Sequence, residues 1–164
     1  MKIFLQNTGE SDSPVLLNLM AQYYEHEQLP FNPALALNAL KNLMQNENWG
    51  RIWLIRADST LVGYIALTFG FSLECFGQDA FVDEFFILEP FRKKGIGQKI
   101  LQMVEIECRL NGIHALHLVV RNNNSLAFQF YEKLGFVGKP YRWMSKPIKS
   151  VEPKNNKNSV TTVV

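Results

Sequence analysis

The stretch Arg92-Lys93-Lys94-Gly95-Ile96-Gly97 stands between a strand-like run, Phe81 to Leu88, and an amphipathic run from Gln98 to Leu110. Its two glycines let a ligand approach the backbone closely, and the first N–H groups of a helix have no partner within the helix. Three cations precede those groups. The stretch therefore predicts a loop that binds a diphosphate at the start of a helix.

Two common diphosphate motifs do not fit this loop. A dinucleotide fingerprint would need a glycine or alanine where Ile100 stands, and it would follow the first strand of the domain. A P-loop would end in Gly-Lys-Ser or Gly-Lys-Thr, whereas Gly97 is followed by Gln98 and Lys99. What remains is a strand, a short connection and R-x-x-G-x-G at the start of a helix.

Composition predicts one globular domain. The 164 residues are 47% hydrophobic and 20% charged, and a chain of this length can bury roughly 70% of its unfolded surface without disulfides or metal. No apolar run approaches the roughly 20 residues of a membrane span, and a net charge of +2 is too small to indicate nucleic acid. The polar chain start is unlike a signal peptide, and two cysteines favour reduced thiols over disulfides or zinc. We therefore expect a cytoplasmic protein that uses no metal and binds neither nucleic acid nor membrane.

Periodicity and capping signals predict the order β-α-α-β-β-β-α-β-α-β. Helices start at Ser13-Pro14 and Asn32-Pro33, where a capping side chain precedes a proline in the first turn. The other elements are a strand over 2–6, a hairpin over 49–57 and 61–73, a strand over 79–88, a helix over 98–110, a strand over 113–120 covered on both faces, a helix over 125–134 and a final strand or hairpin over 136–148. The domain is thus predicted to span 1–148, followed by a polar, mobile tail over 149–164.

Two blocks of the sequence resemble shared motifs of the GNAT superfamily of acetyltransferases. One is Val82-Asp83-Glu84-Phe85-Phe86-Ile87 before the glycine loop, and the other is N-x-x-A-x-x-x-Y-x-x-x-G-F from Asn124 to Phe136. The resemblance covers residues 50–148 well, while residues 1–48 match in element order only. It implies an α/β (α+β) fold with a mixed central sheet of six to seven strands and four helices, and acetyl-CoA as the donor cosubstrate.

The resemblance also implies which residues bind acetyl-CoA. In the family, the strand before the glycine loop leaves backbone N–H groups free for the pantetheine arm and the thioester. The implied residues are Phe85, Phe86, Ile87 and Leu88 for the arm, Arg92, Lys93, Lys94, Gly95, Ile96, Gly97 and Gln98 for the pyrophosphate, and Asn124 and Tyr131 beside the arm. A buried strand, a solvated turn and a plain helix cap would look similar in the sequence.

Acetyl transfer to an amine also needs a base and an acid. An ammonium with a pKa of about 10.4 must lose a proton before it attacks, and family members often place a carboxylate where Asp83 and Glu84 stand. Strand alternation predicts that only one of the two faces the cleft, and Glu84 is preferred as the base. Alternatively, one carboxylate binds a cationic substrate and the other binds backbone. Tyr131 matches the general acid of the family, with aromatic packing as its alternative.

The acceptor is predicted to be a small cationic primary amine, attacked directly in a ternary complex. Acidic residues lie in segments that border the acceptor cleft of this fold, and we expect four of them to bind substrate: Glu25, Glu27, Glu74 and Asp83. A protein N-terminus or lysine as the acceptor, a non-catalytic acyl-CoA-binding module and a nucleotide-binding regulator stay open as alternatives. So does a homodimer, because many relatives pair through their last strands. His114 and His117 are expected to pack within an apolar strand.

Overall fold

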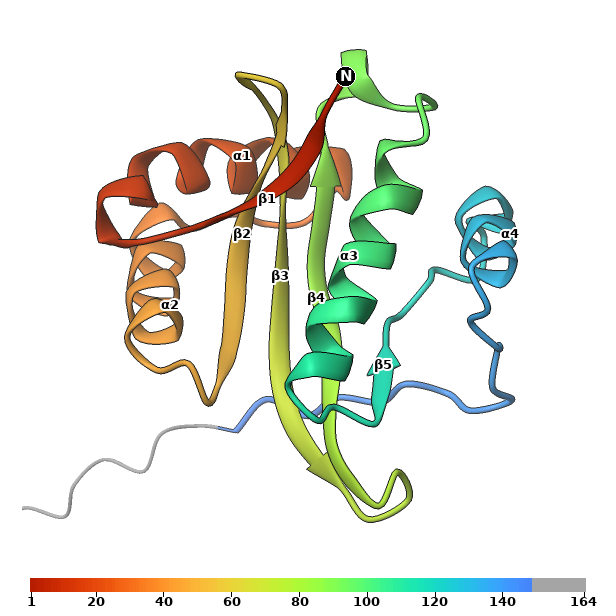
Figure 1. Ribbon diagram of the computed structural model, residues 1–164. Coiled ribbons are helices and arrows are strands. Elements are labelled where there is room, and N and C mark those ends of the chain that lie inside the picture. The colour runs from red at the N-terminus through yellow and green to blue at the C-terminus, as the bar shows by residue number, and fades with distance from the viewer. Residues whose placement is uncertain (149–164) are drawn as a thin grey trace, which may run out of the picture.

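A five-stranded mixed sheet, in the order β1-β2-β3-β4-β5, lies at the centre of the computed structural model, which describes residues 1–148 (Figure 1). The first four strands are antiparallel neighbours, and β5 runs parallel to β4. The strands are β1 (Ile3–Asn7), β2 (Gly50–Ala57), β3 (Thr60–Ser72), β4 (Gly77–Ile87) and β5 (Ala115–His117). The helices are α1 (Ser13–His26), α2 (Pro33–Gln45), α3 (Ile96–Leu110) and α4 (Ser125–Lys133), with short 3-10 turns at Glu10–Asp12 and Glu89–Phe91.

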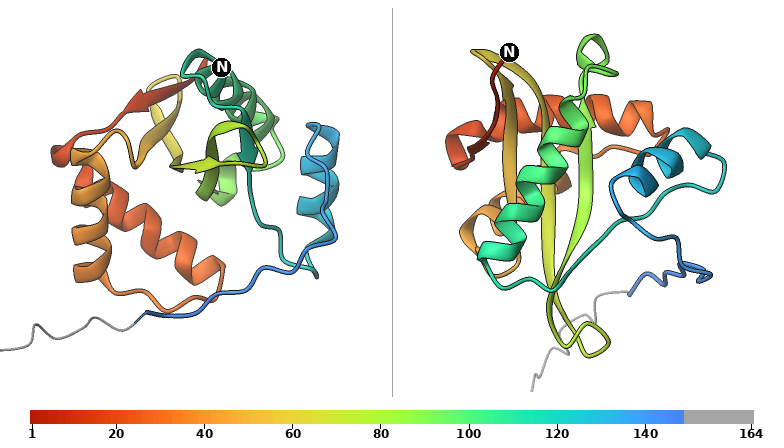
Figure 2. Two further views of the ribbon diagram at one scale, coloured as in Figure 1. Left: turned by 90° about the horizontal axis from the view of Figure 1, so that it is seen from below. Right: turned by 45° about the vertical axis from the view of Figure 1, so that its right-hand side comes forward.

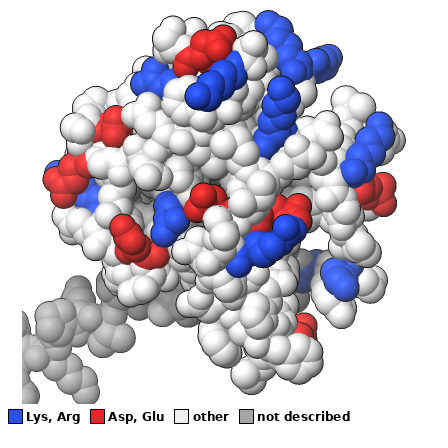
Figure 3. Space-filling view, viewed as in Figure 1, with Lys and Arg blue, Asp and Glu red and all other residues white. Residues whose placement is uncertain are grey.

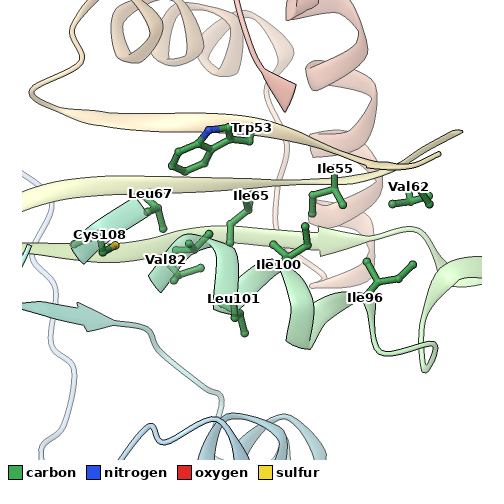
Figure 4. Packing of buried hydrophobic residues seen from close by; sticks show 13 residues of the cluster. Trp53, Ile55, Val62, Ile65, Leu67, Val82, Ile96, Ile100, Leu101 and Cys108 are labelled. Carbon is green, nitrogen blue, oxygen red and sulfur yellow. The ribbon is translucent and has the colours of Figure 1, made fainter. Parts of the chain in front are cut away.

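Helices cover both faces of the sheet. In the left panel of Figure 2, α1 and α2 lie on one side of the strands and α3 lies on the other. Strand side chains alternate between the faces, so each face has its own apolar core. The core beneath α3 includes Trp53, Ile65, Val104 and other residues shown in Figure 4, and the core beneath α1 and α2 includes Leu16 and Tyr64.

The predicted starts of α2 and α4 are confirmed by their caps. The side-chain oxygen of Asn32 accepts hydrogen bonds from the N–H groups of Ala34 and Leu35, each at 3.1 Å. The side-chain oxygen of Asn124 accepts one from the N–H of Ala127 at 3.0 Å. These bonds satisfy N–H groups that the first turn leaves without partners. The first helix differs, because Ser13 lies inside its first turn and Asp12 holds the capping position.

The sheet is smaller than the six to seven strands predicted. The strand expected over 113–120 is only the three-residue β5, and its side chains are half-buried or exposed because it has β4 alone as a neighbour. Residues 136–148 contain no strand. Two prolines in that segment, Pro140 and Pro147, have no N–H to donate to a neighbouring strand. The number of helices is four, as predicted.

Two further expectations concern the ends and the surroundings of the domain. The polar tail predicted over 149–164 lies outside the described residues, so the domain boundary stays a prediction. Within residues 1–148, no helix combines the length and the apolar character that crossing a membrane requires.

Candidate active site

A β-bulge in β4 shapes the site. Glu84 lies opposite Ala66 of β3, and Val82 lies opposite the next residue, Leu67, so Asp83 has no partner in the register. The extra residue reverses the alternation of side chains along β4. Val82 belongs to the core beneath α3, whereas Phe86, four residues later, belongs to the core beneath α1 and α2.

The bulge brings two carboxylates to one face. Asp83 and Glu84, here called the carboxylate pair, both line a pocket between the sheet and the helices α1 and α2. The expectation that only one of them faces the cleft is therefore wrong. Regular alternation would have separated the two side chains, but residues at a bulge do not alternate.

Glu84 is buried, at 9% exposure, and it is held by a tyrosine. The hydroxyl of Tyr64 in β3 donates a 2.7 Å hydrogen bond to its Oε2 atom. Burial raises the pKa of Glu84 above its ordinary value, hydrogen bonding with Tyr64 and Tyr24 opposes that rise, and the charge of Asp83 adds to it. Burial and the Glu84 charge together raise the pKa of the Tyr64 hydroxyl, so Tyr64 stays a neutral donor.

The pocket that the carboxylate pair lines, here called the α1–α2 pocket, has a volume of about 340 Å³. Its walls are mostly apolar and include Met20, Phe31, Leu40, Leu43, Ile52 and Ala66. The Asp83 side chain is accessible from solvent there, but the protein around it removes part of its hydration, and this partial desolvation raises the pKa of its carboxyl. Of the described residues that line the pocket, Asp83 and Glu84 are the only charged ones.

Beyond the bulge, one edge of β4 is open. Its pairing with β5 covers only 79–81, and among the described residues no other strand lies on that side. The N–H of Leu88 donates to the carbonyl of Val62 in β3 at 2.9 Å, so this predicted amide is not free. Consecutive peptide groups of a strand point to opposite neighbours. The N–H groups of Phe85 and Ile87 therefore point toward the open edge.

The glycine loop turns the chain sharply into α3. Lys93 and Gly95 have φ angles of 58° and 75°, both in the left-handed region, and Gly95 caps the helix. A Cβ atom at Gly97 would come within 3.3 Å of the ring of Phe130 in α4, so glycine permits close approach there. Ile96 is 1% exposed and is part of the core beneath α3, so its side chain does not take part in binding.

The three cations of the loop are placed differently. Arg92 donates from Nε to the carbonyl of Ile87 at 2.7 Å, and its Nη1 lies 2.9 Å from Nε2 of His26 at the end of α1. Lys93 and Lys94 are exposed and, within residues 1–148, have no ion-pair partner. Figure 3 shows basic side chains gathered at the end of the molecule where the loop enters α3. Gln98 is exposed in the first turn.

Tyr131 is partly buried in α4, between the aromatic rings of Phe130 and Phe136, whose centroids lie 5.1 and 5.6 Å from its own. Burial and, to a lesser extent, the charge of Glu27 raise the pKa of its hydroxyl to about 12. A neutral phenol is thus maintained near the end of α1. Asn124 lies two helical turns before Tyr131, and its side-chain oxygen accepts the hydrogen bond that caps α4.

The predicted substrate-binding acids other than the carboxylate pair lie outside the α1–α2 pocket. Glu25 and Glu74 are exposed, and neither lines it. Glu27 forms an ion pair with Arg121, with Oε2 3.2 Å from Nε, and its Oε1 lies 3.2 Å from Nδ1 of His26. The structure therefore brings only Asp83 and Glu84 together in the pocket.

The two histidines expected to pack within a buried strand lie at the surface instead. His117 is at the exposed edge strand β5, with Nε2 3.4 Å from the Asp79 carboxylate and 3.8 Å from Sγ of Cys75. Nδ1 of His114 lies 3.2 Å from the carbonyl of Cys75. No cluster of three or more side chains in residues 1–148 is suited to hold a metal ion.

Comparison with known proteins shows the family to which the chain belongs. Residues 16–136 match the model of the acetyltransferase (GNAT) family. The chain belongs to this family. The GNAT domain prediction, with its α/β fold and acyltransferase class, is confirmed, although the sheet has fewer strands than expected.

Relatives with solved structures share the GNAT fold over most of their length. An integron cassette protein from the mobile metagenome of Cole Harbour Salt Marsh is 32% identical, with 90% of this chain and 91% of that chain covered and a TM-score of 0.78. A predicted acetyltransferase from Clostridium acetobutylicum, solved with acetyl-CoA, is 16% identical, covers 89% and 96%, and has a TM-score of 0.73. At that identity the likeness is one of fold.

The match to a curated relative covers a shorter stretch of sequence. The uncharacterized N-acetyltransferase YycN of Bacillus subtilis (strain 168) is 37% identical over 59 residues, which are 36% of this chain and 38% of that protein. The match thus spans well under half of the relative. It agrees with the family assignment and leaves the acceptor open.

Sequence reasoning missed the residues that complete the site. Tyr64 and Tyr24 were not among the predicted site residues, and neither were the α2 leucines Leu40 and Leu43 that line the pocket. One signal was available for Tyr64, since it is a polar-tipped side chain within the apolar run of a central strand. The pocket walls have no comparable signal, because pocket-lining leucines and core leucines follow the same helical spacing.

Proposed function

We propose that the protein transfers the acetyl group of acetyl-CoA to the primary amine of a small molecule, by direct attack in a ternary complex. The observation that carries this proposal is the bulge in β4. It supplies two carboxylates to a pocket on one face of the strand, beside an edge whose amides at Phe85 and Ile87 have no strand partner among the described residues. Acceptor and donor would thus meet at a single strand.

The donor would bind along the open edge of β4 and at the start of α3. The amides of Phe85 and Ile87 would receive the pantetheine arm and the thioester oxygen, and an amide aimed at the developing oxyanion is worth about 10²-fold or more in rate. The pyrophosphate would lie on the N–H groups of the glycine loop, with charge supplied by Lys93 and Lys94. The Clostridium acetobutylicum neighbour, which shares the fold, was solved with acetyl-CoA, and this supports acetyl-CoA as the donor.

The acceptor would enter as an ammonium ion. Asp83 would hold it, and Glu84, with its raised pKa, would accept a proton and leave a neutral amine. The nitrogen then attacks the thioester carbon, the carbon–sulfur bond breaks, and the departing sulfur takes a proton from the Tyr131 hydroxyl. The second proton of the amine nitrogen, which the amide cannot keep, then restores that hydroxyl. A free thiolate, whose thiol has a pKa of about 8.5, is too weak a base to deprotonate a phenol with a pKa of about 12. The transfer from Tyr131 therefore has to be coupled to carbon–sulfur cleavage and to loss of the proton from the amine nitrogen.

A panel of amines with acetyl-CoA tests the proposal by release of free thiol. Small primary amines are expected to give turnover, and peptides with free N-termini or lysines are expected to give none. Turnover of peptides alone would instead support a protein acetyltransferase. Calorimetry with acetyl-CoA, ATP and NAD in parallel should show binding of acetyl-CoA alone, and acetyl-CoA binding with no turnover of any amine would indicate a binding module.

A further inference from the structure

The α1–α2 pocket has its two charged residues, Asp83 and Glu84, next to each other, and its other walls are mostly apolar. From this asymmetry we infer that the acceptor is a primary amine with an apolar alkyl or arylalkyl tail, whose ammonium lies at the carboxylate pair and whose tail lies against α2. The inference rests on the proposed function, and it narrows the acceptor from small cationic amines in general to amphipathic monoamines.

Apolar side chains that line the pocket remain uncovered. Leu35 is 68% exposed although it lines the pocket, and Ala39, one turn later on α2, is also exposed. Leu40 is 4% exposed and is part of the core, so α2 contributes to both core and pocket. Exposed apolar surface inside a concave site is the usual wall of a small-molecule pocket. A bound tail would cover the wall that Leu35 and Ala39 present.

The distribution of charge opposes a polycation. Only Asp83 and Glu84 supply negative charge among the described lining residues, and both come from the same bulge. The second ammonium of a diamine would therefore lie among mostly apolar side chains without a further carboxylate partner, which is unfavourable. Glu27 does not relieve this, because it is paired with Arg121 outside the pocket.

The volume of the pocket suits a tail of moderate length. At about 340 Å³ it lies at the lower end of the range of roughly 300–1,000 Å³ that small-molecule pockets have. Hexylamine and 1,6-diaminohexane form a matched pair for a test. They have the same chain length and differ only by a second ammonium at the far end.

The first experiment measures kcat/KM with acetyl-CoA for n-alkylamines from propylamine to octylamine, for phenethylamine, for 1,6-diaminohexane and for spermidine. Each added methylene is expected to raise kcat/KM about fourfold until the pocket is full. Hexylamine should exceed 1,6-diaminohexane at least tenfold. Spermidine or the diamine equalling hexylamine would overturn the inference and leave the proposed function standing. Turnover of none of these amines, or of peptides alone, would overturn both.

A second experiment tests whether the apolar tail of the amine lies against α2. Ala39→Phe inserts a ring into the pocket wall, whereas Ala34→Phe inserts the same ring on the same helix at a position that does not line the pocket. We expect Ala39→Phe to lower the ratio of kcat/KM for octylamine to that for propylamine at least tenfold, and Ala34→Phe to leave the ratio unchanged. Melting curves and acetyl-CoA titrations verify that both variants fold. An equal ratio in the two variants would overturn the placement of the tail.

Discussion

Tyr64 and Glu84 are joined across the two central strands β3 and β4 by a 2.7 Å hydrogen bond in a buried site. Burial alone would push the Glu84 carboxyl toward its neutral form, which cannot take a proton from an ammonium. The hydroxyl of Tyr64 counters this, because it donates to the charged form of the carboxylate. It also limits the rotation of the Glu84 side chain, so Tyr64 is a positioning residue for the proposed base.

Replacement of Tyr64 by Phe removes the donor and leaves the ring. The pKa of Glu84 should then rise further, and the acidic limb of the pH profile of kcat/KM should move to higher pH. A buried acceptor without its donor also costs about 1–3 kcal/mol of unfolding free energy. Tyr141→Phe, at an exposed tyrosine, is the control. An acidic limb that stays in place would show that Tyr64 does not tune the base.

The two carboxylates should be separable by kinetics. Glu84→Gln removes the proposed base and should lower kcat by about 10²-fold or more. Asp83→Asn should chiefly raise KM for the amine, about tenfold, which is the effect of losing one favourable charge contact. Steady-state kinetics at saturating acetyl-CoA measures both. The reverse pattern, with kcat lost on Asp83→Asn, would assign the base to Asp83.

Glu84→Gln should also stabilise the protein at neutral pH. The folded pKa of Glu84 is raised above its ordinary value of 4.5, so the folded state keeps the proton longer than the unfolded state does. The contribution of Glu84 to stability is therefore full below 4.5 and is lost as the pH rises through the folded pKa. The amide carries no buried charge and still accepts from Tyr64. We expect a melting temperature higher by roughly 2–4 °C at pH 7.5, corresponding to about 1 kcal/mol.

The size of that gain should depend on pH in one direction. It should shrink as the pH falls toward 4.5, because wild-type Glu84 is then protonated in the folded state. Melting curves of both proteins at a series of pH values provide the measurement. A constant difference at every pH would attribute the gain to packing instead of charge.

Tyr131→Phe tests the proposed acid. The phenol is neutral at working pH because burial raises its pKa to about 12, so the variant loses a donor and keeps the ring. Turnover should fall about 10²-fold, while the dissociation constant of acetyl-CoA, measured by calorimetry, stays within about twofold. Unchanged turnover would falsify the acid role. An equal loss in Tyr141→Phe would point to a nonspecific effect.

Gly95→Ala and Gly112→Ala separate conformation from ligand binding. Both glycines have left-handed φ angles, 75° and 69°, and an added Cβ meets no atom within 4 Å at either position. Both alanines should therefore destabilise by about 1 kcal/mol through backbone strain. Only Gly95→Ala, at the proposed pyrophosphate site, should weaken acetyl-CoA binding in calorimetry. Equal affinity in the two variants would remove Gly95 from the donor site.

Local features of the sequence predicted most of the elements. The asparagine caps at Asn32 and Asn124 and the glycine loop at Gly95 act through neighbouring residues in the chain, so their effect can be recognised from spacing. A final strand or hairpin was predicted over 136–148, but a strand needs a neighbouring strand with free N–H and C=O groups. Whether such a neighbour lies beside the segment depends on the tertiary structure. Two prolines also reduce the number of N–H groups that the segment can donate to a neighbouring strand.

The amino-acid sequence by itself determined the element order as far as α4, the family resemblance and the donor expected at the glycine loop, because short motifs carry these. Only the tertiary structure decided the geometry of the acceptor side. The bulge at Asp83 is a mismatch between two strands, so its effect depends on the register of β4 against β3. Likewise, the α1–α2 pocket exists only where two helices meet the sheet, and no local pattern distinguishes its walls from the core.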